Sequence, residues 1–255
     1  MDLFQRTGLL FGDSFLPQAA SKKVIIFGLG GVGSWCAEML VRSGITQLTI
    51  VDADVVAGSN INRQLPATTT TVGRPKVEVM LERLQAINPA AEIKAIQKIY
   101  SEETHAFFEL DRYEYVIDAI DSLEHKVHLL QQTCRTKATL FASMGAALKT
   151  DPLKIRIAEF NQVRGCPLAA AVRRRIRMKG GVDRKFQCVF SEEQFKNRGV
   201  AQQAAAADTD EEGTNPYSEH KRINGTTSYM PAMFGMTLAS LVIRDILKQT
   251  SGENA

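Results

Sequence analysis

Four glycines form a loop that could bind a phosphate: Gly28, Gly30, Gly31 and Gly33. A β-branched apolar run precedes this loop, and an apolar segment with helical period follows it. Glycines let the backbone turn tightly and approach a phosphate, and the N–H groups at the start of a helix hold an anion. Asp52 follows the next apolar run, about 20 positions after the last glycine, a spacing typical of a carboxylate that binds ribose hydroxyls. These residues predict a nucleotide site, for either NAD or ATP.

The segment that follows this carboxylate favours ATP. It contains Asp54, Asn60 and Arg63, and Lys76 comes shortly after. A triphosphate that is attacked at its α-phosphorus needs cations, and usually a metal ion, to neutralise the leaving pyrophosphate, whereas a dinucleotide is held mostly by backbone. Arg63 and Lys76 are suitable cations, and Lys76 starts a predicted helix, where a cation is unfavourable unless an anion is bound nearby. Asn60 fits a turn residue as well as a ligand.

Two more carboxylates, Asp118 and Asp121, lie at the end of the fourth apolar run. In α/β sheets, ligands bind at the carboxyl ends of the strands. Asp121 lies just beyond the run and is the better candidate for holding Mg²⁺, whereas Asp118 could equally cap a turn or accept hydrogen bonds from loop N–H groups.

A parallel sheet would bring these residues to one edge. From residue 23 to about 143, short β-branched runs alternate with segments of helical period, which is the pattern of a doubly wound sheet with helices on both faces. We expect helices over 76–88 and 123–137, and strands over 24–27, 48–51, 93–99, 115–119 and 139–142. The predicted fold is α/β and Rossmann-like, with residues 1–150 as the nucleotide-binding core and 151–255 as an extension of mixed strands and helices.

Three features are expected in this extension. Residues 201–215 have no apolar period and predict a mobile acidic loop. The apolar stretch near the C-terminus is shorter than the roughly 18 residues of a membrane span and predicts a packed helix over about 231–249. The helix that begins at Pro167 carries five basic residues that suit tRNA phosphates about as well as they suit a solvated face: Arg173, Arg174, Arg175, Arg177 and Lys179.

Composition excludes several classes of protein. The chain has 255 residues, of which 44% are hydrophobic and 23% are charged, as in soluble globular proteins rather than collagen-like or disordered ones. Its four cysteines show no Cys-x-x-Cys spacing, which disfavours a zinc site. The net charge of +3 is too small to indicate nucleic-acid binding by itself. Nothing near the N-terminus has the pattern of an export signal, so we expect a cytoplasmic protein without stable membrane association.

Taken in order, these motifs resemble the adenylation domain of the ubiquitin-activating-enzyme-like superfamily. The likeness covers about residues 6–145 and includes the glycine loop, the Asp-x-Asp pair at 52–54, Asn-x-Asn-Arg-Gln at 60–64, Gly-x-x-Lys at 73–76 and Asp-Ala-x-Asp at 118–121. It implies that a carboxylate is activated as an acyl-adenylate with ATP and Mg²⁺.

The resemblance also implies roles at the matching positions. Asp52 would bind the ribose of ATP, assisted at the nucleotide site by Asp54 and Asp118. Three residues would bind the phosphates: Asn60, Arg63 and Lys76. Asp121 would hold the metal ion, and Arg6, on an N-terminal arm, would reach the γ-phosphate of ATP in the other subunit of a homodimer.

Within this superfamily the whole chain is most similar to the bacterial dehydratases that cyclise threonylcarbamoyladenosine in tRNA. The likeness rests on the segments 6–12, 115–122 and 188–192, on Asp151-Pro152 and on the basic helix. It implies that the adenylated carboxylate is attacked by an internal nucleophile of the same modification, with net loss of one water. Such a closure needs no protein nucleophile, because the reacting groups are already tethered.

Other functions remain open at this stage. The chain could adenylate the C-terminus of a ubiquitin-like sulfur carrier, and Cys188, in a predicted polar loop, would then be the candidate for a thioester, although a small packing residue is the favoured interpretation. It could also be a nucleotide-holding partner in a sulfur relay, beside a cysteine desulfurase and a sulfur acceptor. A monovalent cation at the site is a further expectation. An NAD-dependent dehydrogenase would leave Arg63, Lys76 and Asp121 without a purpose.

Overall fold

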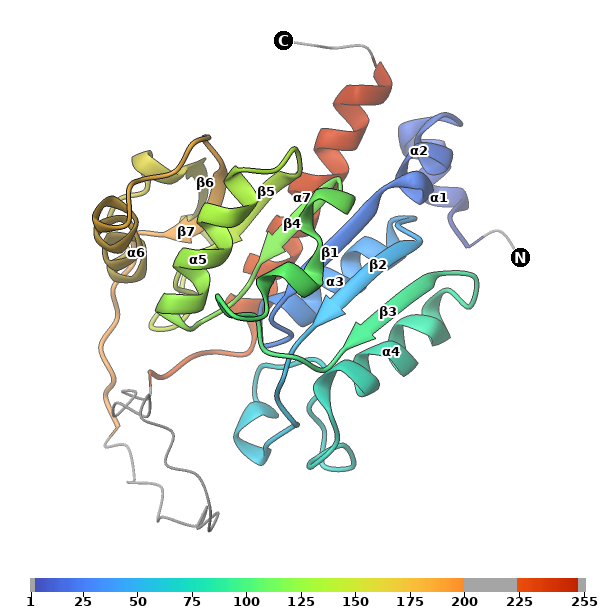
Figure 1. Ribbon diagram of the computed structural model, residues 1–255. Coiled ribbons are helices and arrows are strands. Elements are labelled where there is room, and N and C mark those ends of the chain that lie inside the picture. The colour runs from blue at the N-terminus through green and yellow to red at the C-terminus, as the bar shows by residue number, and fades with distance from the viewer. Residues whose placement is uncertain (1–2, 200–223, 252–255) are drawn as a thin grey trace.

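The computed structural model describes residues 3–199 and 224–251. One seven-stranded sheet crosses the molecule in the order β3-β2-β1-β4-β5-β7-β6 (Figure 1). β6 pairs with β7 in antiparallel fashion, and the other pairs are parallel. The strands are β1 Lys23–Phe27, β2 Gln47–Val51, β3 Glu92–Ile96, β4 Tyr115–Asp118, β5 Thr139–Ser143, β6 Ile155–Glu159 and β7 Gln187–Ser191.

Helices cover both faces of this sheet. Side chains of α2, α3, α4 and α7 share a buried cluster with Ile26, whereas those of α5 and α6 share a second cluster with Ile25. Successive residues of a strand point to opposite faces, so β1 contributes to both clusters. The predicted doubly wound α/β fold is therefore confirmed. The helices are α1 Gln5–Phe11, α2 Phe15–Ser21, α3 Gly33–Arg42, α4 Lys76–Ile87, α5 Leu123–Cys134, α6 Pro167–Met178 and α7 Tyr229–Ser251.

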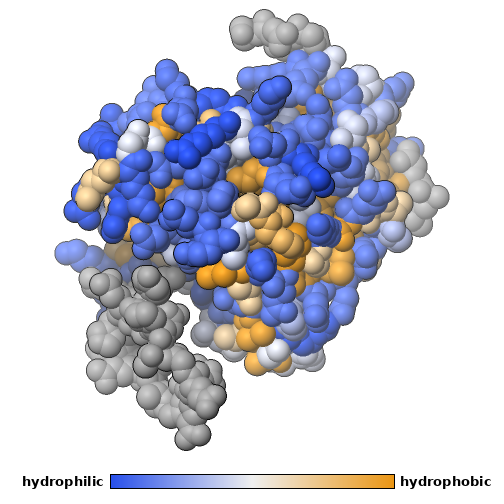
Figure 2. All heavy atoms as spheres, viewed as in Figure 1, coloured by the Kyte–Doolittle hydropathy of each residue, from blue (hydrophilic) through white to orange (hydrophobic). Residues whose placement is uncertain are grey.

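The largest difference from the predicted elements is at the third strand. β3 ends at Ile96 rather than at residue 99, and the connection to β4 contains two short 3₁₀ helices, His105–Phe108 and Leu110–Arg112. Phe108 and Leu110 pack in the same cluster as α5. This connection therefore crosses the sheet on the α5 side. Figure 2 shows apolar side chains gathered at the centre of this face, over the loop between β3 and β4.

The extension after residue 150 continues the same sheet, because β7 pairs with β5. α7 crosses α3 closely, since a Cβ added at Gly235 would lie 2.2 Å from the carbonyl oxygen of Val32. By length and composition α7 could cross a membrane, but 61% of its apolar window is buried inside the protein. It therefore has the burial of a core helix. The predicted acidic loop at 201–215 lies outside the described residues.

Candidate nucleotide site at the carboxyl edge of the sheet

The glycine loop joins β1 to α3 where the strand order reverses, with β2 on one side of β1 and β4 on the other. Ligands of open α/β sheets bind at such a switch point. Gly28 has φ +91°, and a Cβ there would lie 2.7 Å from the carbonyl oxygen of Ala119. At Gly33 a Cβ would lie 1.8 Å from the carbonyl oxygen of Gly28. Only glycines allow this turn, which leads directly into the N-terminus of α3, where an anion is favoured.

Replacing Gly28 by alanine is expected to weaken ATP binding and to lower the thermal stability. The left-handed backbone conformation costs an alanine about 1–2 kcal/mol, and the clash with Ala119 would also displace the loop. Calorimetric titration with ATP and a thermal melt would measure both effects. Gly180→Ala is the matched control, because Gly180 has φ +94° with nothing within 4 Å of its added Cβ. Equal losses of ATP affinity in the two variants would contradict the close-approach argument.

Asp52, Asp54 and Lys76 come together beside this loop. Asp52 directly follows β2, and its carboxylate accepts hydrogen bonds from the backbone N–H of Leu29 at 2.6 Å and of Asp54 at 2.9 Å. The Lys76 ammonium nitrogen lies 2.7 Å from Asp54 Oδ2 and 3.8 Å from Asp52 Oδ1. Burial raises the pKa of Asp52, and the charge of Lys76 opposes that rise. A cation at the start of a helix is unfavourable unless an anion lies nearby. For Lys76, at the start of α4, the carboxylates of Asp52 and Asp54 are that anion.

Arg63 also lies against the glycine loop. A Cβ added at Gly31 would be 3.3 Å from Arg63 Cγ. The guanidinium Nη1 donates to the carbonyl oxygen of Ser59 and to Asn62 Oδ1, both at 2.8 Å. Asn60 Oδ1 accepts a hydrogen bond from the Ala57 N–H at 3.1 Å, as expected of a turn residue. The turn after β2 therefore brings the predicted phosphate cation to the loop that was predicted to hold the phosphates.

Asp118 and Asp121 occupy different environments. Asp118 is fully buried in an ion pair with Lys126, whose Nζ lies 2.7 Å from Asp118 Oδ2 and is itself fully buried. Both side chains also bind the backbone of Ile120. The Ile120 N–H donates to Asp118 Oδ1 at 3.0 Å, and Lys126 Nζ donates to the Ile120 carbonyl oxygen at 2.9 Å. In this position the Asp118 carboxylate offers no surface to a nucleotide, and it fixes the turn against which Gly28 packs. Asp121 is exposed just beyond this turn.

Two other predicted residues lie away from this site. Arg6 is exposed on α1, which packs against α2 through the rings of Phe11 and Phe15, 4.7 Å apart. α2 leads into the amino end of β1, so Arg6 lies at the opposite edge of the sheet from the glycine loop of its own chain (Figure 1). Cys188 lies inside β7 with no exposed surface, and burial raises the pKa of its thiol. The predicted polar loop around Cys188 is wrong.

The five basic residues predicted to contact tRNA fall into two groups. Arg173 binds inside the fold, since its guanidinium donates to the carbonyl oxygen of Phe160 at 2.9 Å and lies 5.8 Å from the centre of that ring. Lys179 directly follows α6 and lies 3.7 Å from Glu124. Arg174 and Arg177 are exposed, and Arg175 is half-buried. Three of the five, Arg174, Arg177 and Lys179, are therefore exposed, and of these Lys179 lies beside Glu124.

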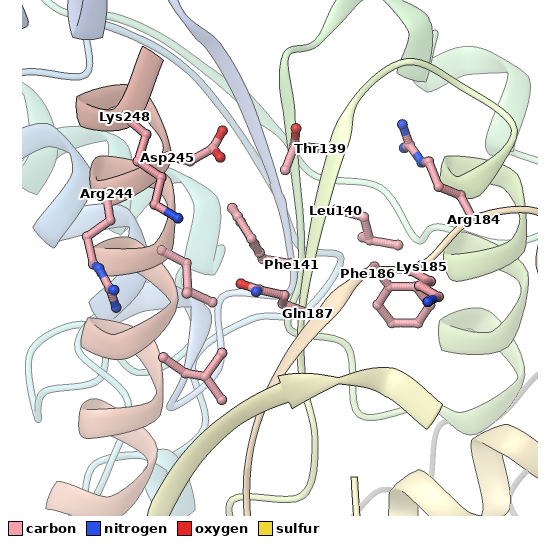
Figure 3. A pocket seen from close by; sticks show the side chains of 12 residues that line it. Thr139, Leu140, Phe141, Arg184, Lys185, Phe186, Gln187, Arg244, Asp245 and Lys248 are labelled. Atoms are coloured by element: carbon pink, nitrogen blue, oxygen red, sulfur yellow. The ribbon is translucent and has the colours of Figure 1, made fainter. Parts of the chain in front are cut away.

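A cavity of about 510 Å³ lies at the opposite, amino edge of the sheet. Figure 3 shows Arg244, Asp245 and Lys248 of α7 on one side of it, facing Phe141 and Gln187 of the strands. Because the glycine loop follows the carboxyl end of β1, this cavity is separate from the candidate nucleotide site.

Comparisons with known proteins agree with this fold. The ThiF family matches residues 4–255. The tRNA threonylcarbamoyladenosine dehydratase of Bacillus subtilis is 35% identical over 248 residues, which are 96% of this chain and 94% of that protein. The crystal structure of the Escherichia coli enzyme in complex with ATP superposes with a TM-score of 0.83 at 30% identity, covering 98% of this chain and 96% of that chain.

A more distant relative is the molybdopterin-synthase adenylyltransferase of Escherichia coli, which is 31% identical over 150 residues, or 58% of this chain and 59% of that protein. The dehydratases match this chain over nearly its full length. The chain therefore belongs to the ThiF family and, within it, to the tRNA threonylcarbamoyladenosine dehydratases.

Proposed function

We propose that this protein uses ATP to dehydrate threonylcarbamoyladenosine in tRNA to its cyclic form. The observation that carries this proposal is the similarity to a dehydratase of that specificity along nearly the whole of both chains. The similarity to an adenylyltransferase, which favours the sulfur-carrier alternative, covers little more than half of this chain. The dehydratase is therefore the better-supported function.

The residues around the glycine loop suit the first step of this reaction. An oxygen of the substrate carboxylate forms a bond to the α-phosphorus of ATP, and the bond from that phosphorus to pyrophosphate breaks. Arg63 and Lys76 would stabilise the charge that develops on the pyrophosphate. Of the three N–H donors of the Lys76 ammonium, Asp54 takes one. Asp52, tied to the loop through Leu29, would orient the ribose.

The second step closes the ring. An internal nucleophile of the modification attacks the activated acyl carbon and gives up its proton to water, and the bond from that carbon to the AMP oxygen breaks. The carboxylate oxygen leaves with AMP, so the nucleoside has lost the elements of one water. The two reacting groups are tethered, which makes a protein nucleophile unnecessary.

We propose Asp121 as the protein ligand of Mg²⁺. Its carboxylate is exposed at the edge of the sheet that carries the glycine loop. In nucleotide sites Mg²⁺ commonly takes one or two carboxylates together with substrate phosphates and water, so a single exposed carboxylate fits this ion. When bound, Mg²⁺ would neutralise part of the phosphate charge. A monovalent cation stays a prediction.

We also propose a homodimer in which α1 of one subunit reaches the site of the other. Within its own chain Arg6 lies at the far edge of the sheet, so it could contact ATP only in a second copy. α1 also exposes Leu9 and Leu10, at 81% and 74% of their surfaces, and a partner subunit would cover them. A cysteine desulfurase with its sulfur acceptor, and the cytoplasmic location, stay predictions.

Replacing Arg174 and Arg177 together by glutamine is expected to weaken tRNA binding and to flatten its salt dependence. Each lost phosphate contact should reduce the slope of log K against log salt by about one. Figure 2 shows hydrophilic side chains over the α6 side of the molecule. Anisotropy titrations of labelled tRNA at several salt concentrations would measure the slope. The double variant Lys94→Gln, Arg112→Gln is the control. An equal loss of tRNA affinity and of salt dependence in this control would show that α6 is not part of the tRNA-binding surface.

The reaction itself is tested by following ATP. We expect tRNA that carries threonylcarbamoyladenosine to stimulate the release of AMP and pyrophosphate, and tRNA that lacks the modification to give no stimulation. Stimulation by a ubiquitin-like carrier with a free C-terminal glycine, and none by the modified tRNA, would select the adenylyltransferase instead.

A further inference from the structure

A cavity of about 410 Å³ that no role above uses lies beside the candidate nucleotide site. Three segments line it: 148–150, which follows β5, 195–199, which follows β7, and 225–227, which precedes α7 (Figure 1). The carbonyl oxygen of Thr226 in its wall accepts a hydrogen bond from Asn62 Nδ2 at 3.4 Å. Asn62 directly precedes Arg63, so the cavity borders the segment that carries the proposed phosphate cation.

The wall of this cavity is a connected structure. The Leu148 N–H donates to the carbonyl oxygen of Gly225 at 3.0 Å, and the Phe195 N–H donates to that of Leu148 at 2.9 Å. The Gly225 N–H donates to Asn197 Oδ1 at 2.8 Å. Leu148 adopts φ +58°, a left-handed conformation that is costly for this residue type and that clusters at ligand sites. Hydrogen bonds therefore hold the three segments together, and Leu148, between the other two segments, has a strained backbone conformation.

Among the described residues, the charged side chains that line the cavity are all cations: Lys149, Lys196 and Arg198. Lys149 is only 4% exposed. Its one hydrogen bond within the described residues is donated to the carbonyl oxygen of Glu193 at 2.6 Å, which leaves two of the three ammonium N–H groups for another acceptor. A buried ammonium is costly unless an acceptor or an anion pairs with it. Burial lowers the pKa of Lys149, and the charge of Glu193 opposes that fall. The ammonium therefore already interacts with one anion of the chain, and its remaining N–H groups suit an anionic group of a ligand as a second partner.

The cavity also offers a flat surface. The Arg198 guanidinium carbon lies 4.9 Å from the centre of the Phe195 ring, and Phe195 is 36% exposed. Bases of single-stranded RNA stack on aromatic rings and on arginine planes, while cations hold the phosphates. The carboxylates of an acidic peptide could pair with the cations, but they offer no flat ring to stack on Phe195 and Arg198. The combination favours a nucleotide.

A hydrogen bond joins the chain next to this cavity to the segment just before the basic helix. Gln194, next to Phe195, donates a hydrogen bond from Nε2 to the carbonyl oxygen of Gly165 at 2.8 Å, and α6 begins at Pro167. A strand of RNA that contacts α6 could therefore reach the Arg63 segment by way of this cavity.

We propose that this cavity binds an unpaired nucleotide of the substrate tRNA, with its base on the Phe195–Arg198 stack and an anionic group on Lys149. This inference rests on the proposed function and names a subsite for its substrate. The subsite would position the modified nucleoside beside the ATP site, and Phe195 and Arg198 would act as positioning residues.

The test uses the full-length protein and tRNA that carries threonylcarbamoyladenosine. Phe195→Ala and Arg198→Gln are each expected to raise the KM for tRNA about 5- to 150-fold, which corresponds to the usual loss of a base–aromatic stack, with the KM for ATP unchanged. Lys149→Met, which keeps the length of the side chain, should also raise the KM for tRNA. Direct binding of the same tRNA without ATP should weaken in parallel.

Phe107→Ala is the matched control, because Phe107 is an exposed ring with the Lys98 ammonium 5.1 Å from its centre, outside the cavity. If Phe195→Ala and Arg198→Gln bind and convert tRNA like the wild type, or if Phe107→Ala is impaired to the same degree, the subsite is refuted although the dehydratase function stands. If the wild-type protein itself fails to act on modified tRNA, the proposed function falls first, and the subsite falls with it.

Discussion

Replacing Arg63 by alanine is expected to lower ATP-dependent turnover about 10²- to 10³-fold, the usual cost of removing one donor that stabilises developing charge. The Arg63 side chain lies against Gly31, and its guanidinium hydrogen-bonds to Ser59 and Asn62 within the same turn. Both acceptors lie in the same turn as Arg63, so the thermal stability should change little. Steady-state release of AMP, with a thermal melt of the same sample, measures both quantities.

Arg112→Ala is the control for this variant. Arg112 pairs with Glu109 at 2.9 Å on the surface, and its loss should leave turnover unchanged. Turnover of the Arg63 variant within a few-fold of the wild type would show that the guanidinium does not stabilise the leaving pyrophosphate. A large fall in thermal stability would show instead that Arg63 holds the turn together.

Replacing Lys126 by methionine is expected to lower the free energy of unfolding by about 3–5 kcal/mol, the usual cost of breaking a buried ion pair by removing one partner. Lys126 and Asp118 are both fully buried, and each also binds the backbone of Ile120. Burial already raises the pKa of Asp118, and Lys126 opposes that rise. The variant would leave a carboxyl group buried without its cation beneath the turn that packs on Gly28. Urea denaturation measures the loss.

A second substitution distinguishes the pair from simple packing. Adding Asp118→Leu to the Lys126 variant should recover much of the lost stability, because an apolar pair of similar volume avoids the cost of the buried charge. Lys154→Met is the control, since Lys154 is 57% exposed and lies 3.7 Å from Asp151. A Lys126 variant no less stable than this control would contradict the assignment.

Local patterns were sufficient to predict the fold and the position of the nucleotide loop. In the sequence, buried parallel strands appear as short runs of β-branched residues. The glycines lie between such a run and a segment of helical period, where the chain must turn from a strand into a helix. Patterns along the chain could not show that Lys76 meets Asp52 and Asp54, because that contact depends on the path of the turn after β2. Lys126 was missed because a lysine in an amphipathic helix normally faces water, and only the packing of α5 against β4 buries it.

The predicted polar loop around Cys188 was wrong for a related reason, although the favoured interpretation of Cys188 as a small packing residue agrees with its complete burial. Cys188 lies in an interior strand, because β7 pairs with both β5 and β6. Interior strands are identified by their neighbours, and those neighbours are distant in sequence. The same holds for the cavity around Phe195, whose three segments are distant in sequence and are joined by tertiary hydrogen bonds.

The central claim is that this chain dehydrates threonylcarbamoyladenosine in tRNA at the expense of ATP. The most direct test is to incubate the purified protein with ATP, Mg²⁺ and tRNA that carries the modification, to digest the tRNA, and to identify its nucleosides by mass spectrometry. We predict a nucleoside lighter by one water, formed only when ATP is present and strongly reduced with the Arg63→Ala variant. An unchanged nucleoside after complete incubation with active, ATP-binding protein would contradict the claim.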